Sequence, residues 1–481
     1  MQPKIQRMTR TEYDAVVVGS GPNGLAAAIA LQQKGLSVLL IEGRKEIGGG
    51  LASAELTLPG FIHDTCSAIH PMAVGSPFFQ ELPLKGYGLN FVYPVIDAAH
   101  PLDNGNSAIL KRSVTETAEE LGDPAYLDLM EGLVKDWPWI FADVMGPLRF
   151  PSDRAAMVRF GIKALSSATH LARRFSTREA RALWGGMAAH SMLPLSYFAS
   201  SAIGLVLLLE GHLQGWPIAV GGSYSIAKAL GSYFISLGGK IETGLYIKSL
   251  EQVPSARAVL FDITPRQLLS IAGHRFSALY RHQLKNYRYG PGVFKIDWAL
   301  DAPIPFRSTY CRQAGTIHIG NTFEEIAAAE KMVWEGKHPE KPFVLLAQQS
   351  LFDDSRAPEG KQTGWAYCHV PNGSVIDMTE AIEKQVERFA PGFRECILAR
   401  HVITAAEMEE LNPNYIGGDI GGGAIDLRQL FTRPALRFSP YRSSARGIYI
   451  CSSSTPPGGG AHGMCGFHAA KRALRDIFKI K

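Results

Sequence analysis

The chain opens with short apolar runs separated by a glycine-rich turn. Residues 13–19 (YDAVVVG) are rich in β-branched side chains, which predicts a buried strand. An alanine-rich segment that reaches Lys34, with Gly35 behind it, predicts a helix. Residues 37–41 (SVLLI) predict a second buried strand, which ends on Glu42. The order of strand, turn, helix and strand is typical of a parallel α/β unit.

The pattern changes further along the chain. From about 96 to 215 it is mainly helical, and the regular α/β alternation is lost. It resumes with a predicted helix at 225–237 and predicted strands around 245–250 and at 259–263. The last segment, 447–478, predicts a strand, a glycine-rich loop and a helix. The α/β character is therefore discontinuous along the sequence.

Composition excludes several classes of protein. The 481 residues are 46% hydrophobic and 19% charged, which is typical of a globular protein and excludes disorder, collagen and coiled coil. The length predicts about two to three domains. A net charge of +5 spread over this length is too weak to indicate nucleic-acid binding. The six cysteines form no Cys-x-x-Cys pair, so the sequence predicts neither a metal site nor a redox dithiol.

Targeting signals also bear on location. The first ten residues are polar and basic, without the apolar stretch of a signal peptide, so we expect a cytoplasmic protein. Residues 191–209 carry no charge, but they include Pro194 and Gly204, which favours a buried helix over a membrane span.

The glycine-rich turn after the first strand has the spacing of a dinucleotide site. Gly19 suits a tight turn, Gly21 lets backbone approach a pyrophosphate, and Gly24 lets helix and strand pack closely. The helix N-terminus then faces the phosphates, and Glu42 stands where a carboxylate accepts the ribose hydroxyls. This GxGxxG is the only strand-associated one, so the sequence predicts one dinucleotide and no tightly bound NAD(P)H. The glycine-rich loop at 458–463 is a second anion cradle for the same cofactor.

Together, these motifs resemble the flavin-dependent amine oxidase and phytoene desaturase superfamily. Within it, the chain is similar to the phytoene desaturase-related oxidoreductases that include pyridine nucleotide-disulfide oxidoreductase domain 2 proteins. The resemblance implies that the cofactor is FAD. It implies that the following residues bind it: Gly19, Gly21, Pro22, Asn23, Gly24, Glu42, Arg44, Gly48, Gly49, Ile247, Ser453, Gly459, Gly460, Ala461, His462, Gly463 and Met464. The cysteine pair of disulfide reductases is absent, so we do not expect that activity.

Three residues are candidates for catalysis. His63 follows the glycines at 48–50, and His462 lies in the predicted flavin loop. Lys295, in the strand-like VFKIDWAL, resembles the lysine that some amine oxidases hold near the flavin. The alternatives are structural roles for the two histidines and a surface position for the lysine.

The resemblance implies a glutathione-reductase-like, FAD-binding Rossmann domain of α/β class, interrupted by an inserted α+β substrate domain. We expect the FAD domain to comprise residues 1–95, 216–285 and 421–481, and the substrate domain to comprise 96–215 and 286–420.

The function implied is FAD-dependent desaturation or saturation of carbon–carbon bonds in an apolar, isoprenoid or polyene substrate. Oxygen, a quinone or an electron carrier would be the redox partner. Amine oxidation, polyene isomerisation by reduced flavin, and a lipid-binding scaffold with structural FAD are the alternatives. The sequence leaves the substrate's identity, the direction of reaction and the oligomeric state open.

A basic stretch lies in the predicted substrate domain. Between Arg149 and Arg181 there are eight Lys and Arg residues, and Val158, Ile162 and Leu165 recur beside them at helical spacing. This pattern is typical of a helix on an anionic membrane surface, and a solvated basic face is the alternative. The sequence therefore predicts peripheral contact with the inner face of a membrane.

Overall fold

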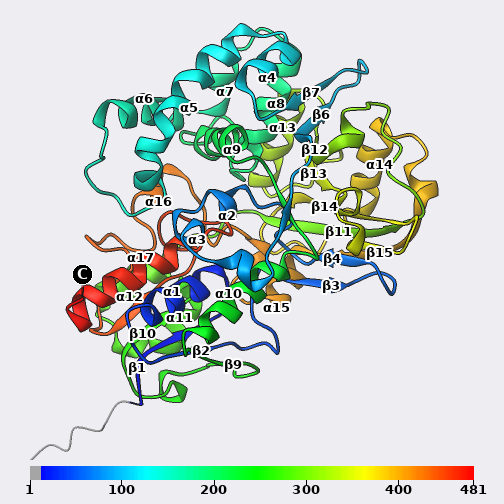
Figure 1. Ribbon diagram of the computed structural model, residues 1–481. Helices are drawn as coiled ribbons and strands as arrows, with labels where there is room; N and C mark the ends of the chain where they lie inside the picture. Colours follow the sequence, from blue (N-terminus) through cyan, green and yellow to red (C-terminus); the bar gives the residue numbers. More distant parts are fainter. Residues whose placement is uncertain (1–11, 481) are drawn as a thin grey trace, which may run out of the picture.

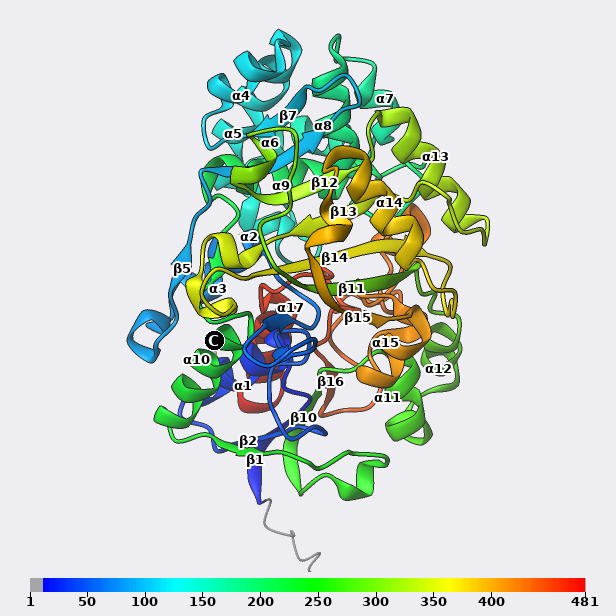
Figure 2. The same ribbon diagram turned by 90° about the vertical axis from the view of Figure 1, so that its right-hand side faces the viewer.

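Two sheets organise the chain in the computed structural model, which describes residues 12–480. A five-stranded sheet lies in the lower half of Figure 1 and a seven-stranded sheet lies above it. Figure 2 shows the same division from the side, with the first and last segments of the chain together in the lower half. The lower domain is thus discontinuous in sequence, and the upper domain is inserted into it.

The five-stranded sheet has the order β16-β10-β1-β2-β9, and all of its pairings are parallel. Its strands are β1 (Tyr13–Val18), β2 (Val38–Ile41), β9 (Lys240–Glu242), β10 (Ala256–Phe261) and β16 (Ile448–Ile450). Three helices pack against one face: α1 (Pro22–Gln32), α10 (Tyr224–Ser236) and α17 (Met464–Ala473). Helices α11 (Pro265–Ala272) and α12 (Ala278–Lys285) cover the other face. Burial on both faces explains why these strands are almost wholly apolar.

The seven-stranded sheet is mixed and has the order β15-β11-β14-β13-β12-β6-β7. Its strands are β6 (Ile96–Pro101), β7 (Ser107–Leu110), β11 (Gly292–Leu300), β12 (Ala314–Ile319), β13 (Val344–Ala347), β14 (Gln362–Val370) and β15 (Ile397–Ile403). Helix α14 (Thr379–Phe389) covers one face. The opposite face of the sheet packs against a helical layer that includes α8 (Arg178–Ala189), α9 (Ser201–Leu213) and α13 (Phe323–Trp334). The remaining long helices of this layer are α4 (Val114–Leu121), α5 (Pro124–Val144) and α6 (Arg154–Ala164).

The structure corrects two expected elements. Residues 245–250 do not form a strand, because the chain there passes over the end of β2, where the amide of Leu245 donates to the carbonyl of Glu42. The buried helix expected at 191–209 begins only at Ser201, after a turn that contains Pro194. No helix within residues 12–480 has the length and apolar character to span a membrane.

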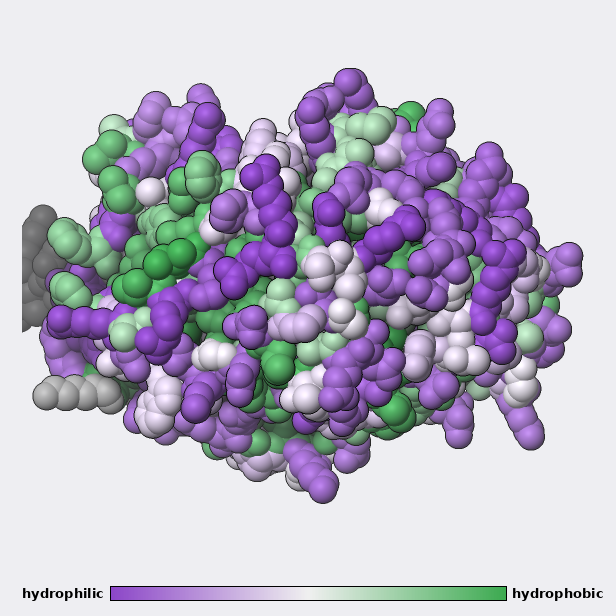
Figure 3. Space-filling model, turned by 90° about the horizontal axis from the view of Figure 1, so that it is seen from above, coloured by the Kyte–Doolittle hydropathy of each residue, from purple (hydrophilic) through white to green (hydrophobic). Residues whose placement is uncertain are grey.

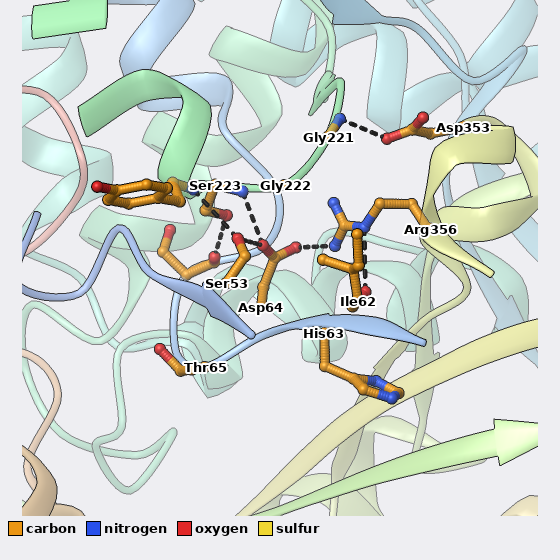
Figure 4. A network of polar contacts seen from close by, with 12 residues as sticks. Ser53, Ile62, His63, Asp64, Thr65, Gly221, Gly222, Ser223, Asp353 and Arg356 are labelled. Atoms are coloured by element: carbon orange, nitrogen blue, oxygen red, sulfur yellow. Dashed lines mark hydrogen bonds and ion pairs between the residues drawn. The ribbon is translucent and has the colours of Figure 1, made fainter. Parts of the chain in front are cut away.

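A buried ion pair joins the two domains. Asp64 ends strand β4 (Ile62–Asp64), which pairs with β3 (Ser53–Glu55), and its Oδ2 accepts from Arg356 Nη2 at 2.5 Å. Both side chains are 1% exposed. Asp64 Oδ1 also accepts from Ser53 Oγ and from the amide of Ser223, each at 2.7 Å. Figure 4 shows these groups converging on Asp64 from three separate segments.

The same network fixes the start of helix α10. The Ser223 amide precedes that helix, so Asp64 accepts from its N-terminal end. Burial alone would raise the pKa of Asp64, but Arg356 and the hydrogen bonds outweigh it and lower the pKa. Gly222, at φ +106°, leaves no room for a side chain, because a Cβ there would lie 2.3 Å from Ser53 Oγ. The Gly221–Gly222 pair therefore allows the close approach on which this junction depends.

We expect Asp64→Asn and Arg356→Met each to lower the free energy of unfolding by about 3–5 kcal/mol, because each leaves a buried charge without its partner. The double variant should lose less than the sum of the two, because it removes both charges. Urea denaturation of the four proteins measures this coupling. Additive losses would contradict the pairing.

Candidate active site

One continuous cavity of about 390 Å³ runs between the two domains. At one end it is lined by the glycine-rich turn, by Glu42 and by residues 245–247. At the other end it is lined by residues of the seven-stranded sheet and of the helical layer, among them Trp216, Thr316 and Trp365. We call these the nucleotide end and the substrate end.

The glycine-rich turn is packed too tightly for side chains. A Cβ on Gly24 would lie 2.0 Å from the carbonyl oxygen of Gly19, and a Cβ on Gly49 would lie 2.9 Å from Gly21 Cα. Gly21 is the N-cap of α1 and has no side chain of its own to cap that helix start. The exposed backbone and the helix dipole therefore form a cradle for an anion.

The carboxylate expected at the ribose position is present. Glu42 follows β2 directly and lines the cavity. Its Oε2 accepts from the Ser20 amide at 3.0 Å, and its Oε1 accepts from the Arg44 amide at 2.9 Å. Arg44 Nη2 in turn donates to the carbonyl of Gly49 at 2.7 Å. This arrangement keeps Glu42 at the mouth of the nucleotide end.

Asp262 also lies in the cradle, and sequence reasoning missed it. It follows β10, it is 7% exposed, and its Oδ2 accepts from the Gly24 amide at 2.8 Å. A Cβ on Gly21 would lie 2.8 Å from the same oxygen. Burial, and to a smaller extent the charge of Glu42, raise the pKa of Asp262 to about 7. The sequence carries no local signal for this role, because Asp262 reaches the cradle only through the pairing of β10 with β1.

The C-terminal loop reaches the same cavity. Ser453, Gly460 and Ala461 line it, whereas Gly459, Gly463 and Met464 lie behind them. His462 is 1% exposed, and its Nδ1 accepts from the Met464 amide at 3.0 Å. The ring thus caps the start of α17, which is a structural contact.

The other two catalytic candidates lie outside the cavity lining. His63 is buried on β4, on the opposite side of the strand from Asp64 (Figure 4), and its Nε2 lies 2.8 Å from Thr57 Oγ1. Burial lowers the pKa of His63 to about 4. Lys295 is 2% exposed and pairs with Asp297, so the alternative of a surface lysine is wrong. His63 Nδ1 lies 3.7 Å from the same carboxylate, which brings these two candidates together.

The residues of the nucleotide end fit FAD. The N-terminal end of α1 at Gly21 suits a diphosphate, Glu42 suits ribose hydroxyls, and buried Ile247 offers an apolar contact for an adenine. The cavity then continues past Ala461 into the apolar substrate end, as an isoalloxazine between the domains requires. Gly24 and Gly48 lie behind the residues that line the nucleotide end.

Known proteins share this organisation. Residues 17–82 match the family described as an NAD(P)-binding Rossmann-like domain. The chain is 25% identical to the rat (Rattus norvegicus) pyridine nucleotide-disulfide oxidoreductase domain-containing protein 2, over 97% of this chain and 94% of that protein. It is 24% identical to a phytoene desaturase (lycopene-forming) of Pseudescherichia vulneris, over 95% of this chain and 98% of that protein. The chain is an oxidoreductase related to the phytoene desaturases.

Solved structures give the same fold. A triple mutant of putrescine oxidase superposes on this phytoene desaturase relative with a TM-score of 0.61 and 16% identity, covering 97% of this chain and 99% of that one. The expected FAD-binding fold of the oxidoreductases is therefore confirmed. The matched family's description names NAD(P), but the matched segment holds the end of β1, the glycine-rich turn and α1, which together can bind the ADP half of either dinucleotide.

We expect Asp262 to give FAD binding a pH dependence. Above about pH 7 the carboxyl group ionises and repels the diphosphate, so we expect the Kd for FAD to rise by about tenfold between about pH 6 and pH 8. Asp262→Asn keeps an oxygen that accepts from Gly24 but carries no charge, so its Kd should be nearly constant over this range. Fluorescence titration of the apoprotein with FAD measures both.

The matched control for this experiment is Asp97→Asn. Burial raises the pKa of Asp97 to about 6, but this residue lies on β6 in the other domain. Its substitution should leave the pH profile of FAD binding unchanged. An unaltered profile in Asp262→Asn would contradict the role of Asp262.

Proposed function

We propose that this chain uses FAD to desaturate or saturate carbon–carbon bonds in an apolar, isoprenoid or polyene substrate. The observation that carries the proposal is the single cavity that joins a nucleotide cradle to an apolar chamber. Leu207, Trp216 and Leu345, each less than 10% exposed, line the far part of that chamber. The name of the phytoene desaturase that is similar over nearly the whole chain supports the same substrate class.

The chain's own residues position the reactants and exclude water. Bound FAD supplies the acceptor for a hydride from the reacting carbon. The glycine-rich turn and Glu42 hold its nucleotide half, and the loop at Gly460–Ala461 bounds the passage to the substrate end. Neither of the two candidate histidines needs to move a proton, because His63 and His462 both make structural contacts. Oxygen, a quinone or an electron carrier completes the cycle.

Anaerobic mixing of the FAD-loaded protein with phytoene tests this function. We expect the flavin absorbance to bleach in proportion to the phytoene added, and the product to contain two hydrogens fewer than phytoene. His63→Ala should retain FAD and lose less than the ~10²–10⁴-fold typical of a general acid or base, because His63 lies outside the cavity lining.

Gly21→Val is the control without cofactor, because its side chain collides with Asp262 and blocks the cradle. Hydrogen peroxide release with putrescine, in the absence of bleaching by isoprenoids, would favour amine oxidation instead. Rapid flavin reduction by NADPH alone would contradict the expected redox partners.

We also propose that α6 touches an anionic membrane. Val158 and Ile162 on this helix are 58% and 69% exposed, and Phe150, just before it, is 90% exposed. Figure 3 shows the molecule from above, and apolar side chains gather toward its left. Helix α6 lies on the same side in Figure 1. An apolar substrate resides in a bilayer, so contact with one would supply it.

The ion pairs divide the basic stretch. Arg149 pairs with Asp143, Arg159 with Asp136 and Arg181 with Glu324. Within residues 12–480 the other five cations have no such pair: Arg154, Lys163, Arg173, Arg174 and Arg178. Partial burial and the nearby charges of Arg174 and Arg159 lower the pKa of Lys163, as expected for clustered cations.

Changing Lys163, Arg173, Arg174 and Arg178 to Glu should abolish cosedimentation with anionic liposomes at low salt, since each cation contributes about 1 kcal/mol near such a surface. A matched set of Glu substitutions at Arg257, Arg275, Lys285 and Arg446 in the lower domain should leave binding unchanged. Equal cosedimentation of wild type and the first variant would contradict the proposal and leave the stretch a solvated basic face.

A further inference from the structure

One face of the seven-stranded sheet forms a wall of the substrate end. Across the strands, His318 lies opposite Leu345, and Leu345 opposite Tyr367. Thr316 and Trp365 each lie two residues before a member of this row, so they share its face. Thr316, Leu345, Trp365 and Tyr367 all line the cavity. The opposite face, with Ile317, Leu346 and Ala366, packs into the core.

Two polar atoms of the cavity-lining side chains on this wall have no hydrogen-bond partner within residues 12–480. They are Thr316 Oγ1 and Trp365 Nε1, whose residues are 0% and 4% exposed. Leaving a buried donor without a partner costs about 1–3 kcal/mol, and native structures do so rarely. Because both side chains line the substrate end, a bound molecule can supply the missing partner.

A third polar group lies at the same end. His190 lines the cavity, and its Nε2 lies 3.0 Å from His318 Nε2. Burial lowers the pKa of His190 to about 3 and that of His318 well below its ordinary value, so both rings are neutral. One ring must therefore donate to the other.

The tautomers follow from His318 Nδ1, which is buried and has no partner within the described residues. A buried acceptor without a partner costs less than a buried N–H without one, so Nδ1 of His318 carries no proton. His318 then donates from Nε2 to His190 Nε2, and His190 keeps its own proton on Nδ1. His190 thus contributes a donor to the substrate end.

We infer that the substrate end binds a neutral carbonyl oxygen carried by an otherwise apolar molecule. The indole of Trp365 is a donor only, His190 offers an N–H, and the Thr316 hydroxyl donates or accepts. A carbonyl oxygen, with two lone pairs, satisfies such a donor set, whereas a hydrocarbon leaves it unpaired. This inference rests on the proposed function only in taking the cavity as the substrate site.

The charges near this wall exclude an ionised group. Lys295, whose Nζ lies 6.0 Å from the centre of the Trp365 ring, is already paired with Asp297. Among the residues that the structure describes, none would give a carboxylate at this end a free cation, and an ammonium group could not accept from the donors. An aldehyde, a ketone or a quinone is the class that remains.

Equilibrium dialysis of the FAD-loaded protein against four isoprenoid probes tests the inference. The probes are geranial, myrcene, geranic acid and geranylamine, which share a similar apolar skeleton and differ in the polar group. We expect geranial to bind about tenfold more tightly than myrcene, as two neutral hydrogen bonds allow. The acid and the amine should bind no better than myrcene.

Thr316→Val keeps the shape of the side chain and Trp365→Phe keeps an aromatic ring, and together they remove two of the three donors. The double variant should therefore lose most of the preference for geranial over myrcene. Thr363→Val is the matched control. Thr363 is 1% exposed, and its hydroxyl, like that of Thr316, has no partner within residues 12–480, but Thr363 lies outside the cavity lining. It should keep the preference for geranial.

Equal binding of geranial and myrcene to the wild type would overturn the inference. A preference for geranial that the double variant keeps in full, or tighter binding of geranic acid, would overturn it too. Absence of binding by all four probes would overturn it as well. Dialysis needs no turnover, so a protein that prefers geranial but whose flavin is never bleached would refute the proposed redox function alone.

Discussion

The buried pair of Asp64 and Arg356 is the contact on which the relation between the two domains depends. Asp64 belongs to a short hairpin that leaves the lower domain, which holds the nucleotide end, while Arg356 comes from the upper domain. The amide before α10 and the Ser53 hydroxyl complete the carboxylate's partners. Because a buried charge is costly unless every partner is in place, this junction permits one arrangement of the domains. The cavity between them takes its shape from that arrangement.

The sequence predicted the nucleotide end well, because its signals are local. The glycines at 19, 21 and 24 and the carboxylate at 42 lie within one strand–helix–strand unit, and their spacing alone determines how they meet. Asp262 was missed for the opposite reason. It reaches the cradle through a parallel pairing between β1 and β10, which lie more than 200 residues apart in the sequence, and no local pattern encodes that pairing.

For the substrate end, the sequence predicted only an apolar character and not the residues that line it. The resemblance implied an inserted domain for an apolar substrate, but which side chains face the cavity depends on the register of a seven-stranded sheet. The burial of Lys295 shows the same limit. Its strand, β11, is buried over its whole length, and Asp297 two residues later supplies the charge that lets a lysine lie there.

The order of strands in the five-stranded sheet of the lower domain has a consequence for the synthesis of the protein. Strand β1 is central, but β16 and α17, from the end of the chain, complete its sheet and pack on α1. A nascent chain that has exposed only its first few hundred residues therefore presents an unfinished sheet edge and an uncovered apolar helix. Contacts of such sequence separation form slowly. The complete cofactor site, which includes Ser453, Gly460 and Ala461, therefore exists only after these residues have left the ribosome.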